Sequence, residues 1–140
     1  MKVSISGVRG VFGDDLNLKD NVLMLGLRED IPRVLASADL YVIPSLSEGM
    51  GQSTMEALAM GVPVIASDVG GLPELIIDDQ TGTLVPPKNV LALAKTIIGL
   101  LSDKEKSARL AERAKQSVIN YYSIERTVDK TLNLYSELLK

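Results

Sequence analysis

Short runs of continuously apolar residues constrain the fold of this chain more than any other feature. The clearest are Leu40–Ile43 and residues 64–66, each bounded by turn residues. A strand with one face in water would alternate apolar and polar residues, whereas continuous runs are typical of parallel strands covered on both faces. Thr83–Val85 is a shorter run of the same kind, and Val3–Ile5 and residues 22–25 are two further candidate strands. We therefore expect a parallel sheet.

Helix signals fill the segments between these runs. Asp30 stands at an N-cap position, with Pro32 in the first turn, where a missing N–H costs nothing. A helix over residues 53–60 is expected to stop at Gly61. A helix over residues 89–101 and a final helix place apolar residues on one face each: Val90, Leu93, Ala94, Ile97 and Leu101 in the first, and Ile124, Val128, Leu132, Tyr135 and Leu139 in the last. Strands that alternate with helices predict an α/β domain with a Rossmann-like parallel sheet, followed by C-terminal helices.

Composition excludes several classes of protein. The chain has no histidine and no cysteine, which rules out zinc fingers and Ser–His–Asp or Cys–His catalysis. Its net charge of −3 gives no basic surface for nucleic acid, so we expect no nucleic-acid partner. It contains no apolar run near the roughly 20 residues of a spanning helix and no signal-peptide pattern. A cytoplasmic location is expected, with peripheral membrane association as an alternative.

Two glycine-containing loops are the candidate ligand site. Residues 44–53 follow the strand at 40–43, and residues 67–74 follow the strand at 64–66. In open parallel sheets, ligands bind at the carboxyl ends of the strands, where loops lead into helix N-termini. Gly49 and Gly51 would let the backbone approach a phosphorylated ligand closely. Purely steric requirements of strand-to-helix turns are the alternative explanation of these glycines.

Two carboxylates separated by seven residues extend this site. Glu48 lies in the first loop, and Glu56 lies on the helix that follows. A carboxylate on that helix can accept two hydrogen bonds from a vicinal diol such as a ribose. The alternatives are a capping box, in which Glu56 returns to the N–H of Ser53, and a solvated loop charge at Glu48.

The chain from residue 17 to residue 139 resembles the C-terminal half of the family-4 retaining glycosyltransferases with the GT-B fold, the "glycosyl transferases group 1". The motifs stand in the family's order in LYVIPSLSEGMGQSTMEALAMGVPVIASDVGGLPEL. The resemblance implies a partial C-terminal domain of the GT-B fold that binds a nucleotide-diphosphate sugar as donor substrate, without a metal or other cofactor. By resemblance, Glu56 would hold the ribose hydroxyls, and Glu48 would lie near the donor hexose as the catalytic candidate. The remaining donor-binding residues would be Gly49, Met50, Gly51, Pro44, Ser45, Val69, Gly70 and Gly71.

The sequence also departs from that family. A complete GT-B enzyme has an acceptor domain, and its donor domain carries an Arg and, five residues later, a Lys that neutralise the leaving diphosphate. Here Arg9 is followed five residues later by Asp14. We therefore expect residues 21–140 to be an incomplete donor domain, preceded by an atypical segment, residues 1–20, with one strand. Such a chain would bind the donor without being active alone. The alternative is a non-catalytic nucleotide-binding or interaction module.

Two further expectations concern the N-terminus and self-association. Residues 4–13 resemble the N-terminal segment of phosphohexomutases, although the phosphoserine and metal-binding loops of that family are absent. A sheet that begins with so short a segment would leave an apolar edge or face under-covered. The partner would be a second copy of the chain, as a homodimer, or an N-terminal acceptor domain. Closure of the sheet by Val3–Ile5, with Phe12 as a plug, is the alternative.

Overall fold

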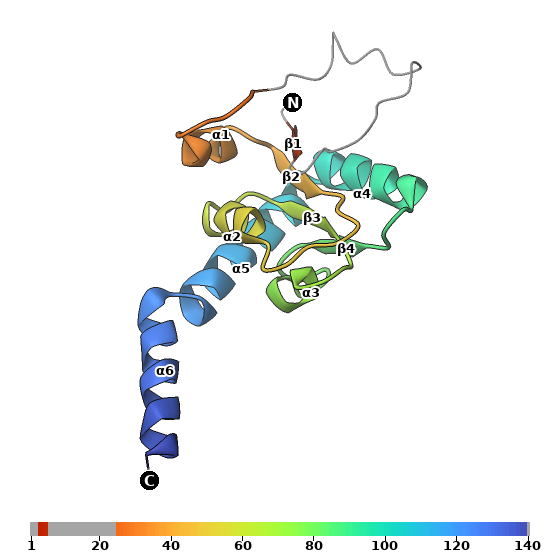
Figure 1. Cartoon of the computed structure of the whole chain (residues 1–140). Coiled ribbons are helices and arrows are strands. Elements are labelled where there is room, and N and C mark those ends of the chain that lie inside the picture. Colours follow the sequence, from red (N-terminus) through yellow and green to blue (C-terminus); the bar gives the residue numbers. More distant parts are fainter. Residues whose placement is uncertain (1–2, 6–24, 140) are drawn as a thin grey trace.

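A four-stranded parallel sheet forms the centre of the molecule (Figure 1). The structure is a computed structural model and describes residues 3–5 and 25–139. The strands lie in the order β1–β2–β3–β4, and their register pairs Val3 with Leu40, Tyr41 with Val64 and Ile65 with Thr83. Their bounds are Val3–Ile5, Leu40–Ile43, Val64–Ser67 and Thr83–Val85. The predicted parallel sheet is confirmed, and Val3–Ile5 occupies its edge beside β2.

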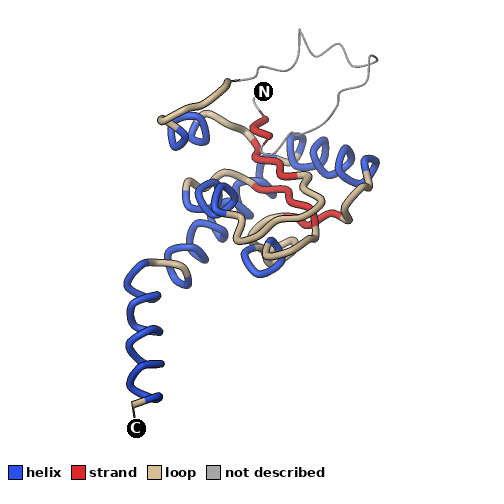
Figure 2. Tube along the Cα trace, viewed as in Figure 1, coloured by secondary structure: helices blue, strands red, loops and turns tan. Residues whose placement is uncertain are grey.

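Six helices surround and extend the sheet in the described part of the chain (Figure 2). Strands and helices alternate up to β4, and three helices then follow in succession, the last of which leads away from the sheet (Figure 1). The helices are α1 Ile31–Ala36, α2 Gln52–Ala59, α3 Leu72–Leu75, α4 Val90–Ser102, α5 Lys104–Tyr121 and α6 Ile124–Leu138. None of the described helices is long and apolar enough to cross a membrane.

Both faces of the sheet are buried, as the continuous apolar runs predict. Tyr41 and Ile43 of β2 belong to one core cluster together with Leu58 of α2. Leu40 and Val42 of β2 belong to the opposite cluster, which α4 and α5 complete. Because successive side chains of a strand point to opposite faces, four consecutive apolar residues are needed to fill both cores. Because both faces of the sheet are covered, a ligand can reach it at the loops that follow the carboxyl ends of the strands.

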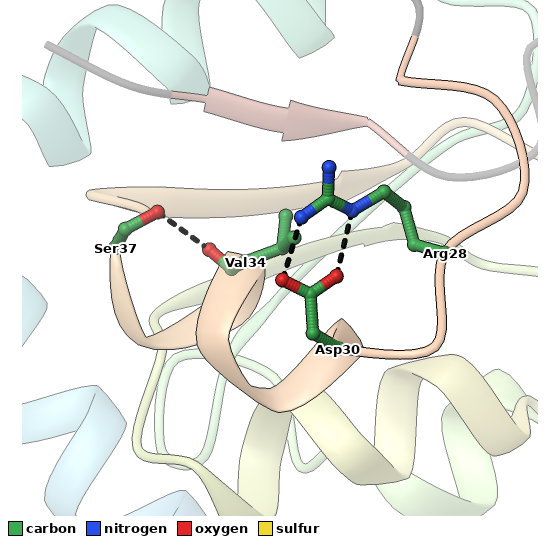
Figure 3. Close-up of polar contacts among 4 residues, drawn as sticks. All are labelled: Arg28, Asp30, Val34 and Ser37. Atoms are coloured by element: carbon green, nitrogen blue, oxygen red, sulfur yellow. Dashed lines mark hydrogen bonds and ion pairs between the residues drawn. The ribbon is translucent and has the colours of Figure 1, made fainter.

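The start of α1 differs from the sequence prediction. Asp30 occupies the N-cap position, but its side chain makes no cap hydrogen bond. Instead, Arg28 donates from Nε and Nη2 to the two carboxylate oxygens, at 2.6 and 2.5 Å (Figure 3). These hydrogen bonds hold the pKa of the Asp30 carboxyl below its usual range. A neighbouring cation has therefore replaced the helix N–H groups as the partner of this carboxylate.

The apolar faces of α4 and α6 also differ from the predicted packing. In the stripe predicted for α4, Leu93, Ile97 and Leu101 pack against the core as expected. Val90 is 75% exposed, whereas Leu100, outside the stripe, is buried. No residue of α6 is buried, and every apolar side chain of its predicted face that is described is exposed. The 3.6-residue period located both helices, but it could not show which part of each stripe reaches the core.

Several predictions fall outside the described residues. A strand is predicted at residues 22–25. Residues 22–24 are outside the described part of the chain, and Leu25 lies in a loop. Arg9, Phe12 and Asp14 are also outside the described residues, as is the expected boundary at residue 20. These expectations stay predictions.

Candidate functional site

The two predicted loops meet at the carboxyl edge of the sheet. The N–H of Gly71 donates to the carbonyl oxygen of Glu48 at 3.4 Å. Gly70 has a φ of +55°, and a Cβ atom placed on it would lie 1.9 Å from the same oxygen. A Cβ atom on Gly71 would lie 2.3 Å from the carbonyl oxygen of Gly49. The glycines at positions 70 and 71 are thus required so that the two loop backbones can touch.

Gly49 has no such steric requirement in the described part of the chain. An added Cβ atom would meet no described atom within 4 Å, and its φ is not positive. The residue is exposed at the rim of the loop. The steric explanation therefore covers Gly70, Gly71 and also Gly51, which has a φ of +64°, but not Gly49, where a glycine leaves the backbone open to a ligand.

The start of α2 differs from the predicted one and changes the interpretation of Ser53. The helix begins at Gln52, with Gly51 at the N-cap in the left-handed region and no side-chain cap hydrogen bond. Ser53 is therefore the second residue of the helix, and a capping box with Ser53 at the N-cap is excluded. Its hydroxyl oxygen instead accepts a hydrogen bond from Tyr41 Oη at 2.9 Å. The N-terminal N–H groups of α2 lie beside the glycine loop, without a side-chain cap.

A hollow of about 440 Å³ lies next to Glu48. Its lining joins loop residues to helix residues: Glu48, Gly49, Met50, Met55, Gly71, Glu74, Leu75 and Tyr122. The Glu48 side chain is half-buried and accepts a hydrogen bond from Ser45 Oγ at 3.3 Å. Among the described residues that line the hollow there is no Lys or Arg, so its charged groups are the two carboxylates. Such a surface suits a neutral hydroxylated group against apolar side chains.

Other predicted site residues are distributed around this hollow. Glu56 is exposed on α2 and does not line it. Pro44 and Ser45 lead out of β2, and Val69 packs partly against the core below the second loop. The structure thus brings Glu48, Gly49, Met50, Gly70 and Gly71 together and leaves Glu56 at a separate place on α2. In the described part of the chain, no three acidic side chains are grouped to hold a metal ion.

Tyr122 is a lining residue that the sequence analysis missed. It lies at the corner between α5 and α6, and its hydroxyl donates to the carbonyl oxygen of Glu74 at 2.7 Å. Met55, Glu74 and Leu75 were likewise not identified as lining residues. Glu74 lies in the second predicted loop, residues 67–74, so its position in the sequence could have identified it as a lining residue. The contact of Tyr122 with Glu74 depends instead on the path of α5 across the domain.

The buried hydroxyl of Thr54 in α2 allows a test of the packing beside this site. Its side chain is 0% exposed, and Oγ1 has no hydrogen-bond partner among the described residues. We expect Thr54→Val, which replaces the hydroxyl with a methyl group, to raise the free energy of unfolding by about 1 kcal/mol in urea denaturation. Thr96→Val is the matched control and should lower stability, because Thr96 Oγ1 donates to the carbonyl of Ala92 at 2.9 Å. A lower stability of Thr54→Val would show that its hydroxyl has a partner.

The fold and the position of this site define a class of protein. A parallel α/β sheet with glycine loops and a helix N-terminus at the carboxyl ends of its strands is the arrangement of nucleotide-binding domains. The chain belongs to the family of glycosyl transferases group 1, whose model matches residues 13–117. Its structural neighbours are GT-B glycosyltransferases, which confirms the predicted fold class.

Individual relatives agree with this assignment. The chain is 35% identical over 126 residues to N-acetyl-alpha-D-glucosaminyl L-malate synthase of Bacillus anthracis, covering 90% of this chain and 33% of that protein. The structure of Anabaena HepE in complex with UDP has a TM-score of 0.78 at 30% identity, covering 85% of this chain and 33% of that one. The C-terminal domain of a group 1 glycosyl transferase, LpcC, from Francisella tularensis has a TM-score of 0.66 at 32% identity, covering 74% and 53%. The chain thus spans about a third of the full-length relatives.

Proposed function

We propose that this chain is the donor-binding part of a retaining, metal-independent glycosyltransferase and holds a nucleoside diphosphate sugar at loops 44–51 and 68–71. Gly49 carries the proposal, because its missing side chain has no steric reason in the described structure and lies next to the uncapped start of α2. HepE, which shares the fold, has been solved with UDP and with UDP-glucose. Both observations support a nucleotide sugar as the ligand.

The chemistry of the two regions suggests how they divide such a ligand. The N–H groups at the start of α2, together with the backbone of residues 49–51, would face the diphosphate, since helix N-termini favour anions. The hollow beside Glu48 has carboxylates and apolar walls and suits the sugar, with Glu48 as the candidate catalytic residue. Exposed Glu56 would accept hydrogen bonds from the ribose hydroxyls.

Transfer itself would need groups beyond those described. Cations at the leaving diphosphate usually contribute strongly to such reactions, and Arg9, the nearest match to the family's Arg, is followed five residues later by Asp14 in place of a Lys. We propose that sugar transfer requires an acceptor-binding domain and that the chain alone has negligible activity. The alternative, a non-catalytic nucleotide-binding or interaction module, rests on the same departure from the family's cationic pair. It would bind the nucleotide without turnover even when an acceptor domain is supplied.

The exposed apolar side chains of α6 form a candidate surface for binding a partner. Ile124, Val128, Leu132 and Tyr135 are among them, and no residue of the helix is buried. An apolar surface of this kind is usually covered by another surface. A homodimer or an acceptor domain is our proposal for that cover.

Glu56→Gln tests the role of the carboxylate in nucleotide binding. The substitution removes the charge that strengthens hydrogen bonds to ribose, so we expect the affinity for UDP to fall roughly 10- to 100-fold in isothermal titration calorimetry. The melting temperature should change little, because Glu56 is exposed. Glu137→Gln on α6 removes an equal charge away from the loops and should leave the affinity unchanged. Equal affinity of Glu56→Gln and the wild type would contradict the ribose-binding role.

A further inference from the structure

Tyr41 carries a buried hydroxyl that contacts the helix of the proposed site. The residue lies in β2, is 2% exposed and belongs to the core cluster between the sheet and α2. Its hydroxyl donates to Ser53 Oγ, in the first turn of α2, at 2.9 Å. Because a phenylalanine would fill the same core volume, the hydroxyl is a polar group that packing alone does not require.

The start of α2, like those of α1 and α3, lacks the side-chain cap that α4, α5 and α6 have. Asn89, Asp103 and Ser123 cap α4, α5 and α6 with side-chain hydrogen bonds. In contrast, α2 begins at a left-handed glycine without such a bond. The contact between Tyr41 and Ser53 therefore joins the first turn of α2 to the sheet while leaving its terminal N–H groups free of a side-chain cap. Free N–H groups are what a helix end offers to an anion.

The same contact bears on Glu56. Ser53 and Glu56 are three residues apart in α2, so they lie on neighbouring positions of one helix face. Ala57 and Leu58 pack α2 against the core, and the hydrogen bond that holds Ser53 against β2 adds a polar restraint on the rotation of its first turn. That rotation determines where the exposed carboxylate of Glu56 and the N–H groups of the first turn are presented.

We propose that Tyr41 is a positioning residue for nucleotide binding: its hydroxyl, through Ser53, sets α2 so that Glu56 and the helix start face the ligand together. The inference rests on the proposed function, because it concerns the same ligand. It adds a buried residue that does not itself touch the ligand. It also gives Ser53 a role in place of the excluded N-cap.

Titration of the whole chain with UDP tests the proposal. Tyr41→Phe and Ser53→Ala should each weaken UDP binding about 3- to 10-fold, at a temperature where circular dichroism shows every variant folded. Ser53→Thr keeps a hydroxyl and should retain most of the affinity. Tyr135→Phe, which removes an exposed hydroxyl from α6, should bind like the wild type. In a Glu56→Gln background, Tyr41→Phe should weaken binding by a clearly smaller factor than in the wild type, since one of the two groups it positions is gone.

The outcomes separate this inference from the proposed function. If the wild-type chain does not bind UDP, both are overturned. If the wild type binds and Tyr41→Phe binds equally well, the positioning role is overturned and the proposed function stands. A loss in Tyr41→Phe that is the same with and without Glu56 would also overturn it, because a structural effect independent of Glu56 predicts simple additivity.

Discussion

Gly70→Ala is expected to lower the free energy of unfolding by about 2–5 kcal/mol and to abolish detectable UDP binding. The residue has a φ of +55°, which costs an alanine roughly 1–2 kcal/mol. The new Cβ atom would also lie 1.9 Å from the carbonyl oxygen of Glu48, so the two loop backbones would have to separate. Overpacking of this kind adds about 1–3 kcal/mol. Urea denaturation and calorimetric titration measure the two effects.

Gly99→Ala is the matched control for that substitution. Gly99 lies in α4, and an added Cβ atom there would meet no described atom within 4 Å. An alanine should leave UDP binding unchanged and raise stability by up to about 1 kcal/mol, because glycine is unfavourable inside a helix. If Gly70→Ala proves as stable and as able to bind UDP as Gly99→Ala, the close approach of the two loops is contradicted.

Leu72→Ala should cause a loss of similar size through a different mechanism. Leu72 is 0% exposed in α3, and a Cβ atom on Gly51 would lie 3.0 Å from its Cδ2 atom. The Leu72 side chain therefore packs against Gly51, the N-cap residue of α2. Its truncation leaves a cavity beneath the loop and should lower the free energy of unfolding by about 2–5 kcal/mol, measured in urea.

Ile98→Ala provides the comparison for Leu72→Ala. Ile98 is 65% exposed on α4, so removing its side chain should cost less than about 0.5 kcal/mol. UDP affinity should fall in Leu72→Ala even at low temperature, where the chain stays folded, and should not change in Ile98→Ala. Similar stabilities for the two variants would show that α3 does not support the loop as described.

Local patterns predicted the central elements because these elements satisfy local and global requirements at once. Residues 40–43 fill both cores of the sheet, and that need is already visible as four consecutive apolar residues. Gly61 ends α2 with a φ of +69°, a conformation that the residue type itself indicates. The two loops of the site follow from the same logic, since consecutive parallel strands end at one edge.

Details that depend on distant or competing partners were not predictable. Asp30 stands at a helix start, yet Arg28 binds its carboxylate with two hydrogen bonds, and the sequence gives no ranking of the two partners. Ser53 is not an N-cap, because Gly51 begins the helix earlier and the buried hydroxyl of Tyr41 contacts the serine. Tyr122 reaches Glu74, 48 residues earlier in the chain, through the path of α5, which no local pattern encodes.

Amide chemical-shift mapping of the whole chain with UDP-glucose tests the central claim most directly. We expect saturable shifts concentrated at residues 44–56 and 68–74, the two loops and the first turns of α2 and α3. UDP should reproduce the shifts around the start of α2 and should leave those of the hollow beside Glu48 weaker, because it lacks the sugar. No saturable shifts, or shifts centred on α4 and α6, would contradict the assignment of these loops as the donor site.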